Sequence, residues 1–377
     1  MKRKIFLDNA STTPLRKEVY ISLLKTLKRF GNPSSNHSLG VYNKYNIEYS
    51  RIKIAKILNI SAEEIIFTSS GTEANNLILR NCVKNLNVQC IITSLLEHKS
   101  VLETVYDLYL QYDIIVKFVK FNSKGEIDLN NLRKLLKENT NITLVSLMYV
   151  NNEIGNILNL KKVSEICREF NTYLHSDTIQ AIGHLNLNLK KLNIHFASAS
   201  AHKFYGPYGI GFAYIRKKIS IKSFITGGLQ EKNRRAGTEN IYGIIGMTEA
   251  LKLAYNNLKY EKNYIQNIKK YCIKKLHNNI PKLIFNGLSK NINKSIYTIL
   301  SIAFPKKYLL SLNLDLKGVI ISQASACISS EYSHVFKSLY QNTKRYIQDL
   351  TFLRISFGIF NKKKEIKNFL KLFLSFF

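Results

Sequence analysis

The chain has 377 residues, of which 45% are hydrophobic and 11% aromatic. It exceeds the length at which a single core usually stops growing and is too apolar to remain disordered, so we expect a globular protein with two domains. The formal net charge is +31, but Lys and Arg are spread along the chain without an Arg-rich block, which argues against nucleic acid as a primary partner and leaves only weak, salt-sensitive binding to phosphates.

The cysteines and the lengths of the apolar runs indicate in which cellular compartment the protein works. The cysteines form no CxxC pair and no Cys/His cluster with zinc spacing, which favours a reducing compartment and no intrinsic metal. The apolar run after the basic N-terminal residues is too short for a signal peptide, and no run of about 18 apolar residues could cross a bilayer. We expect a cytoplasmic protein with no membrane partner. The five cysteines are Cys82, Cys90, Cys167, Cys272 and Cys327.

The first two thirds of the chain alternate between helical and strand-like patterns. Helical spacing covers residues 15–30 and 41–58, and helix-like segments recur at 75–82 and 160–170. Between them lie apolar runs of strand length. This alternation predicts an α/β fold with a mainly parallel sheet covered by helices on both faces, with ligands beyond the carboxyl ends of the strands. The runs are at 65–68, 90–93, 114–118, 144–148, 173–175 and 196–198.

The pattern changes after about residue 250. A long helical stretch at 247–278 is followed by short strands near 283–304 and by an amphipathic helix near 363–377. These elements predict a second, smaller α+β domain. We divide the chain into a large domain at 15–250 and a small domain formed by 1–14 and 251–377.

Two polar groups follow neighbouring predicted strands. Lys203 ends a run of small residues before a turn at 206–209, and burial there would lower its pKa so that it could form a Schiff base with an aldehyde cofactor. Alone this signal is weak, because most of the 56 Lys and Arg residues belong to the surface. Asp177, 26 residues earlier, could accept a hydrogen bond from a protonated pyridine nitrogen. The alternative for Asp177 is a helix N-cap.

Two further segments could complete such a site. Gly71 and Thr72 lie between a predicted strand and a helix, where backbone amides and hydroxyls can bind a phosphate. An ordinary helix cap is the alternative. His98 follows the next predicted strand, where it could stack on a cofactor ring or move protons near neutral pH, although a lone histidine is usually structural.

The C-terminal third contributes a thiol and a guanidinium group. Cys327 has small and hydroxylated neighbours, typical of an accessible loop, whereas Cys82, Cys90 and Cys167 lie among apolar residues. Cys327 is therefore the best candidate nucleophile. Arg354 lies inside an apolar strand, which indicates either a bidentate carboxylate clamp or an internal salt bridge.

These segments together resemble a known enzyme family. The motifs occur in the family's order and cover nearly the whole chain, so chance agreement does not explain the similarity. The sequence is similar to the class V, fold type I pyridoxal-phosphate enzymes and, within them, to the group I cysteine desulfurases of the IscS/NifS type. The motifs are LDNASTTP (7–14), GNPSSNHSLG (31–40), FTSSGTEANN (67–76), EHKSVL (97–102), YVNNEIG (149–155), HSDTIQ (175–180), SASAHKFYGPYGIG (198–211), GGLQE (227–231), RRAGTEN (234–240), SACISS (325–330) and RISFG (354–358).

The resemblance implies a fold type I large domain with a seven-stranded sheet, and pyridoxal 5'-phosphate as cofactor. It implies that Cys327 attacks the sulfur of bound L-cysteine, which gives L-alanine and an enzyme persulfide. It further implies a homodimer, in which Thr238 reaches the phosphate of the second subunit. The remaining roles that it implies are cofactor attachment for Lys203, the pyridine nitrogen for Asp177, the phenolic oxygen for Gln180, stacking for His98, the phosphate for Gly71, Thr72, Ser200 and His202, and the substrate carboxylate for Asn152 and Arg354.

The resemblance also implies acceptors for the sulfur. These are an iron–sulfur scaffold protein, a sulfur-relay protein or a tRNA-thiolation protein, and the persulfide on Cys327 could be a transient iron–sulfur ligand. Two alternatives stay open. Another class V enzyme, such as an aminotransferase or a selenocysteine lyase, would share Lys203 and Asp177 without needing Cys327. A nonenzymatic basic protein that binds RNA or DNA would need none of these residues.

Overall fold

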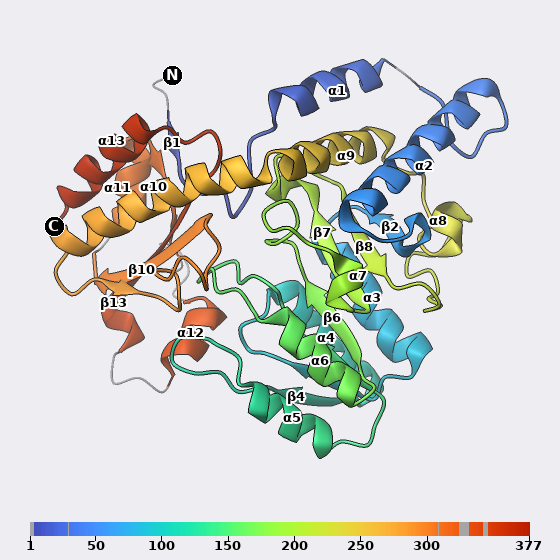
Figure 1. The fold of residues 1–377 in the computed structure, drawn as a ribbon, viewed down its shortest axis with the longest axis horizontal. Coiled ribbons are helices and arrows are strands. Elements are labelled where there is room, and N and C mark those ends of the chain that lie inside the picture. The colour runs from blue at the N-terminus through green and yellow to red at the C-terminus, as the bar shows by residue number, and fades with distance from the viewer. Residues whose placement is uncertain (1–3, 29, 308, 324–331, 342–345) are drawn as a thin grey trace.

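The computed structural model describes residues 4–28, 30–307, 309–323, 332–341 and 346–377 (Figure 1). Its largest sheet has seven strands in the order β2-β8-β7-β6-β5-β3-β4. Neighbouring strands run parallel except at β8, which is antiparallel to both β2 and β7. The expected mainly parallel sheet is confirmed, and β8 is the strand that the sequence patterns missed. The strands are β2 (Ile65–Thr68), β3 (Cys90–Thr93), β4 (Ile115–Phe118), β5 (Thr143–Ser146), β6 (Tyr173–Asp177), β7 (Phe196–Ser200) and β8 (Gly211–Ile215).

Helices cover both faces of this sheet. Helices α3 (Gly71–Leu86) and α4 (Lys99–Tyr112) lie on one face, and α6 (Leu160–Glu169) and α7 (Leu189–Leu192) lie on the other (Figure 1). Successive residues of β3 show why its sequence is apolar throughout. Ile91 packs into the core beneath α3 and α4, whereas Cys90 and Ile92 pack into the core on the opposite face. A strand buried on both faces has no polar alternation, as the sequence indicated.

Two helices differ from the sequence expectation in their bounds. Helix α3 begins at Gly71 rather than near residue 75, because the Ser70 hydroxyl caps it by accepting a hydrogen bond from the Glu73 amide at 3.2 Å. The long helical stretch is two helices, α9 (Ile241–Asn256) and α10 (Leu258–Asn279), which meet at Asn257. Helices α1 (Lys17–Leu27), α2 (Ser38–Leu58), α5 (Leu129–Lys137) and α8 (Gln230–Asn233) complete this part of the chain.

The C-terminal third builds a second sheet. Its four strands run in the order β12-β13-β10-β9, with antiparallel neighbours. Near the N-terminus β1 (Ile5–Phe6) pairs with β11 (Val319–Ile320), so the chain's first strand joins its last third. The remaining elements are β9 (Ile284–Phe285), β10 (Ile299–Pro305), β12 (Ser322–Gln323), β13 (Leu350–Ser356), α11 (Leu310–Leu316), α12 (His334–Tyr340) and α13 (Lys363–Leu374).

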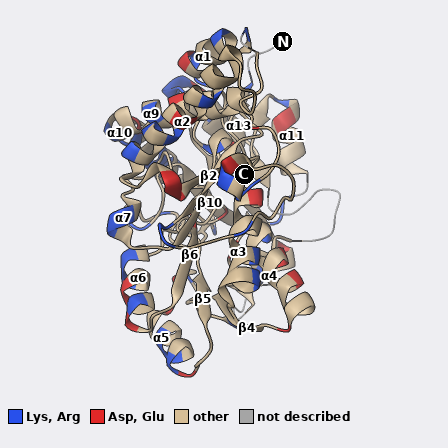
Figure 2. Ribbon diagram, turned by 90° about the vertical axis from the view of Figure 1, so that its right-hand side faces the viewer, with Lys and Arg blue, Asp and Glu red and all other residues tan. Residues whose placement is uncertain are grey.

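The positive charge is distributed over the molecule. Figure 2 shows Lys and Arg on helices of both parts, among them α5, α6, α7, α10 and α13, with acidic residues on other turns of the ribbon. None of the helices within the described ranges combines the length and apolar character needed to cross a membrane.

Replacing Glu231 with glutamine is expected to lower the free energy of unfolding by about 3–5 kcal/mol, because it removes the buried carboxylate from the Arg51 guanidinium group and leaves Glu48, whose side chain is 42% exposed, as its counter-charge. The Glu231 carboxylate bonds both Nη atoms of Arg51 at 2.7 Å and accepts a bond from the Phe67 amide at 2.9 Å. Urea unfolding measures the loss. Glu169→Gln, in an exposed pair with Arg133, should cost under about 1 kcal/mol. Equal decreases in the free energy of unfolding of the two variants would contradict the larger contribution expected of the buried ion pair.

Candidate active site

A pocket of about 420 Å³ opens beyond the carboxyl ends of β6 and β7. Ten of the twelve residues that the sequence singled out line it, so the structure brings together groups from six separate stretches of chain. Of the other two, Thr238 lines a separate cavity and Cys327 lies outside the described residues. The ten residues are Gly71, Thr72, His98, Asn152, Asp177, Gln180, Ser200, His202, Lys203 and Arg354.

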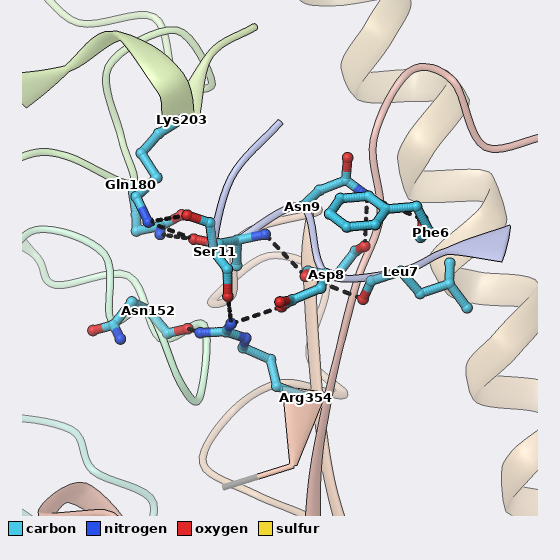
Figure 3. A network of polar contacts seen from close by, with 11 residues as sticks. Phe6, Leu7, Asp8, Asn9, Ser11, Asn152, Gln180, Lys203 and Arg354 are labelled. Carbon is cyan, nitrogen blue, oxygen red and sulfur yellow. Dashed lines mark hydrogen bonds and ion pairs between the residues drawn. The ribbon is translucent and has the colours of Figure 1, made fainter. Parts of the chain in front are cut away.

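Lys203 lies just after β7 and points its amine into this pocket. Its Nζ donates hydrogen bonds to the backbone oxygens of Ala10 and Ser11, each at 2.8 Å (Figure 3). Burial and the nearby Arg354 lower its pKa to about 8, although Asp177 and Asp8 oppose the shift. The side chain therefore combines a fixed position with an accessible neutral form, which is what a nucleophilic amine needs.

Lys203 is expected to react with an amine-acylating reagent much faster at pH 9 than at pH 7. The neutral amine is the reactive form, and with a pKa of about 8 it changes from the minor to the major form across this range. Mass spectrometry of the Lys203 peptide from ligand-free protein measures the rate at each pH. A midpoint near the unperturbed lysine value of about 10.4 would contradict the assignment.

Asp177 is the last residue of β6, and its carboxylate is buried. Its Oδ2 accepts a bond from the Asn75 side chain at 2.9 Å, and its Oδ1 accepts one from the Ile179 amide at 3.0 Å. Within the described ranges no basic side chain forms an ion pair with it. A buried carboxylate is usually paired, so this arrangement suits a ligand that brings a positive charge.

His98 is the N-cap of α4, and its tautomer follows from its contacts. The Ser100 amide can only donate, and it donates to the His98 Nδ1 at 3.1 Å. In the neutral ring the proton is therefore on Nε2. The Ser100 hydroxyl contacts the same Nδ1 at 2.8 Å and also accepts from Asn75, which links His98 to Asp177. Burial lowers the pKa of His98, with a further decrease from Lys203, so the neutral ring dominates at pH 7.

The start of α3 offers a binding site for an anionic group. The first amides of a helix have no partner inside the helix, and the helix dipole makes this end positive. A side chain at Gly71 would collide with Ile179, whose Cδ1 lies 2.1 Å from the position of a Cβ. Ser200 and His202 face the same pocket. Burial lowers the pKa of His202 to about 4, with Lys203 adding to the shift, so His202 is neutral at pH 7.

Arg354 enters the pocket from β13, and three of its five N–H donors have partners in the described part of the chain. Its Nη1 donates to the Asn152 backbone oxygen at 2.9 Å, and its Nη2 donates to Asp8 Oδ1 at 2.8 Å and to the Ser11 hydroxyl at 2.6 Å (Figure 3). Its Nε is buried without a partner in the described part of the chain. Arg354 therefore forms the internal ion pair that the sequence offered as one alternative, and the carboxylate clamp stays a prediction.

Cys327 lies outside the described residues, but both flanking segments lie beside the pocket. On one side, Ser322 of β12 stands opposite Arg354 in the sheet. On the other side, the Ser333 hydroxyl donates to the Glu153 carboxylate at 2.7 Å, and His334 Nε2 donates to the Glu97 backbone oxygen at 2.8 Å. Glu153 and Glu97 are sequence neighbours of Asn152 and His98, so the segment starts and ends next to the site.

The other four cysteines cannot serve as nucleophiles. Cys82, Cys90, Cys167 and Cys272 are all buried. Burial raises the pKa of each thiol, to about 12 for Cys167. A thiol that stays protonated and inaccessible is inert, which agrees with the sequence-based choice of Cys327.

Thr238 lies apart from the pocket within one chain. It lines a smaller cavity of about 70 Å³ together with Gly209, Arg235 and Asn240. The structure of a single chain therefore neither brings Thr238 to Lys203 nor tests its contribution from a second subunit.

The sequence reasoning missed the contribution of residues 8–13, which we name the N-terminal strap. Its Ala10 oxygen accepts bonds from Lys203 and from the Gln180 side chain at 2.9 Å, and its Asp8 and Ser11 side chains bind Arg354. Thr13 bonds the His202 backbone oxygen at 2.8 Å. The run of small polar residues in the strap was visible, but nothing near it in the sequence indicated its partners.

Comparison with known proteins agrees with this geometry. The aminotransferase class-V family model matches residues 5–369. The cysteine desulfurase IscS of Dictyoglomus turgidum is 41% identical over 90% of this chain and 86% of its own length, and that of Buchnera aphidicola is 37% identical over 97% and 91%. A solved NifS-like protein superposes with a TM-score of 0.90 at 32% identity, covering 99% of this chain and 98% of its own. The chain therefore belongs to the aminotransferase class-V family and, within it, to the cysteine desulfurases.

Proposed function

We propose that this chain removes sulfur from L-cysteine with pyridoxal 5'-phosphate, giving L-alanine and a persulfide on Cys327. The observation that carries the proposal is the single pocket shared by Lys203, Asp177 and Arg354, beside which the segment containing Cys327 begins and ends. An amine, a carboxylate and a guanidinium group in one pocket match the cofactor's aldehyde, its pyridine nitrogen and an amino-acid carboxylate.

The residues fit the cofactor. Asp177 is a buried carboxylate without a cationic partner in the described ranges, and Gly71 at the start of α3 lines the pocket. Lys203 would hold the cofactor covalently, and Gly71, Thr72, Ser200 and His202 would hold its phosphate. Gln180 would bind its phenolic oxygen, and His98 would stack on its ring. When bound, pyridoxal phosphate acts as an electron sink for the substrate carbons, provided that its nitrogen stays protonated.

The chain's own groups would then orient the substrate and handle its protons. Arg354 Nε, which has no partner in the described part, would bind the cysteine carboxylate, with Asn152 beside it. The Lys203 amine, with a pKa of about 8, can take up and return a proton near neutral pH. His98 has its Nε2 proton available, because its Nδ1 is occupied by Ser100.

The sulfur step would use the Cys327 thiolate as nucleophile. A new S–S bond forms between Cys327 and the substrate sulfur while the substrate C–S bond breaks, and its electron pair leaves with carbon. Protonation of that carbon yields alanine. Cysteine and an enzyme thiol thus become alanine and an enzyme persulfide, with no outside oxidant or reductant.

The persulfide sulfur would pass to an acceptor in the cytoplasm. The candidates are an iron–sulfur scaffold protein, a sulfur-relay protein and a tRNA-thiolation protein, and the Cys327 persulfide would transiently contact iron during cluster assembly. The names of the relatives support sulfur transfer as the general role. Nucleic acid and membranes are not proposed as primary partners.

We also propose a homodimer and a division into two domains. Helices α1 and α2 expose large apolar side chains, among them Leu27, Tyr45 and Ile52, each more than half exposed in one chain, and apolar patches of this kind often mark protein interfaces. A second copy would cover them and bring its Thr238 to the phosphate. The proposed large domain is 15–250 and the small domain is 1–14 with 251–377, each built around its own sheet.

Product analysis tests the proposed function. The purified, cofactor-loaded chain should convert L-cysteine to L-alanine and, with a reducing thiol present, release one sulfide for each alanine. An aminotransferase would instead form a keto acid from cysteine, and a nucleic-acid-binding protein would form neither product. Light scattering tests the dimer, which should have twice the chain mass of 43.4 kDa.

A further inference from the structure

Asp8 is a charged group that contacts the pocket residue Arg354 and that the reaction described above does not use. Its carboxylate bonds Arg354 Nη2 at 2.8 Å, and both side chains are mostly buried, with 20% of Asp8 and 11% of Arg354 exposed. The Ser11 hydroxyl bonds the same Nη2 at 2.6 Å, and the Asn152 backbone oxygen bonds Nη1. Figure 3 shows these partners gathered around the guanidinium group from the strap and from the loop after β5.

The strand that carries Arg354 also holds Asp8 in place. Asp8 forms a parallel bridge with Ser356, two residues beyond Arg354 on β13. The Asn9 side chain donates to the Ser356 backbone oxygen at 2.9 Å, and the Ala10 amide donates to the Ser356 hydroxyl at 2.9 Å. Asp8 and Arg354 are thus fixed to one another through a common strand.

The hydrogen bonds of the Arg354 guanidinium group are unevenly distributed over its three nitrogens. The strap takes both donors of Nη2 and Asn152 takes one of the two donors of Nη1, whereas Nε is buried with no partner among the described residues. A long arginine side chain loses considerable rotamer freedom when it is fixed. A buried arginine also needs a counter-charge while no substrate is present. Asp8 supplies that charge at Nη2 and leaves Nε without a bond to it.

We propose that Asp8 is a positioning residue for the substrate, which fixes the Arg354 guanidinium group at the wall of the pocket so that the group meets the amino-acid carboxylate. This deepens the proposed function, on which it rests. Asp8 could instead compete with the substrate for the guanidinium group. The two roles predict opposite signs, because loss of a positioning group weakens binding of the carboxylate whereas loss of a competitor strengthens it.

The test measures ligand binding by cofactor-loaded Asp8→Asn protein. The probes are L-alanine, which carries a carboxylate, and cysteamine, which is cysteine without its carboxylate, each titrated by the change in cofactor absorbance. Asp8→Asn should weaken L-alanine binding by about 10- to 100-fold, the range expected for a lost charged hydrogen bond. Cysteamine binding and cofactor content should stay unchanged. The KM for L-cysteine should rise more than kcat falls.

Matched variants separate this role from a structural one. Asp315, in the C-terminal third, forms an exposed ion pair with Lys4 near the N-terminus. Asp315→Asn should leave both titrations unchanged. Asp8→Glu keeps the charge and should recover part of the L-alanine affinity. Should Asp8→Asn not fold, Ser11→Ala removes the other side-chain partner of Nη2 and should weaken L-alanine binding in the same direction.

Several outcomes would overturn the proposal. Unchanged or tighter L-alanine binding would show that Asp8 does not position Arg354. Equal weakening of L-alanine and cysteamine, or loss of cofactor, would show a structural role. The L-alanine titration needs no sulfide release, so failure of the Asp8 proposal is distinguishable from a wild-type chain that does not desulfurate cysteine.

Discussion

Replacing Lys203 with alanine is expected to abolish covalent attachment of pyridoxal phosphate and to lower sulfide release from cysteine by at least about 1,000-fold. No other lysine lines the pocket among the described residues, so no second amine stands ready to take over. The variant should lack the yellow absorbance of the lysine-bound cofactor. Borohydride reduction followed by peptide mass spectrometry should find no modified lysine.

Lys269 offers a matched control for this change. It is fully buried in α10, its Nζ bonds the Ser295 hydroxyl and the Ile296 backbone oxygen at 2.8 Å, and burial lowers its pKa to about 7. It therefore shares burial and a lowered pKa with Lys203 but lies outside the pocket. Lys269→Met should keep the cofactor and its absorbance. Cofactor loss in this variant alone, with attachment intact in Lys203→Ala, would contradict the assignment.

Replacing Cys327 with alanine is expected to leave cofactor attachment intact and to lower sulfide release by at least about 1,000-fold, because the sulfur loses its acceptor. The remaining thiols are buried with raised pKa values and cannot substitute. Absorbance measures the cofactor, and a sulfide assay measures turnover.

Cys167→Ala is the control for the loss of a thiol. Cys167 is buried in α6, where its removal should affect packing only modestly. This variant should retain wild-type turnover per bound cofactor. Sulfide release that survives in Cys327→Ala but not in Cys167→Ala would reverse the roles assigned to the two residues.

The polar residues after β3, β6 and β7 could be predicted as a group. His98, Asp177 and Lys203 each follow a strand of a parallel sheet, and the carboxyl ends of parallel strands meet at one edge. Continuous apolar runs marked those strands because both faces of the sheet are covered. The sequence thus indicated which side chains converge, although the direction of each side chain came only from the structure.

The contacts of Arg354 were not predictable in the same way. Arg354 and Asp8 are 346 residues apart, and the strap reaches Lys203 through backbone oxygens, which every residue possesses. The contact between Asn152 and Arg354 likewise uses a backbone oxygen. Such contacts depend on how two sheets are placed relative to one another, and sequence periodicity carries no information about that placement.

The prediction of one long helical stretch at 247–278 was wrong for a local reason. Apolar and Lys-rich turns continue with helical spacing across Asn257, but this residue ends α9 and precedes α10. Its side chain bonds the Leu253 backbone oxygen at 3.0 Å, inside the last turn of α9. Asparagine competes with the helical backbone for hydrogen bonds, and a pattern of apolar spacing does not register that competition.

The central claim is that Cys327 receives the sulfur of cysteine, and peptide mass spectrometry after reaction with L-cysteine tests it most directly. The cofactor-loaded protein is mixed with one equivalent of L-cysteine in the absence of reductant and acceptor, alkylated and digested. The peptide that contains Cys327 should gain the mass of one sulfur atom, in proportion to the alanine formed. Full alanine formation with an unmodified Cys327 peptide, or with the added sulfur on another cysteine, would contradict the claim.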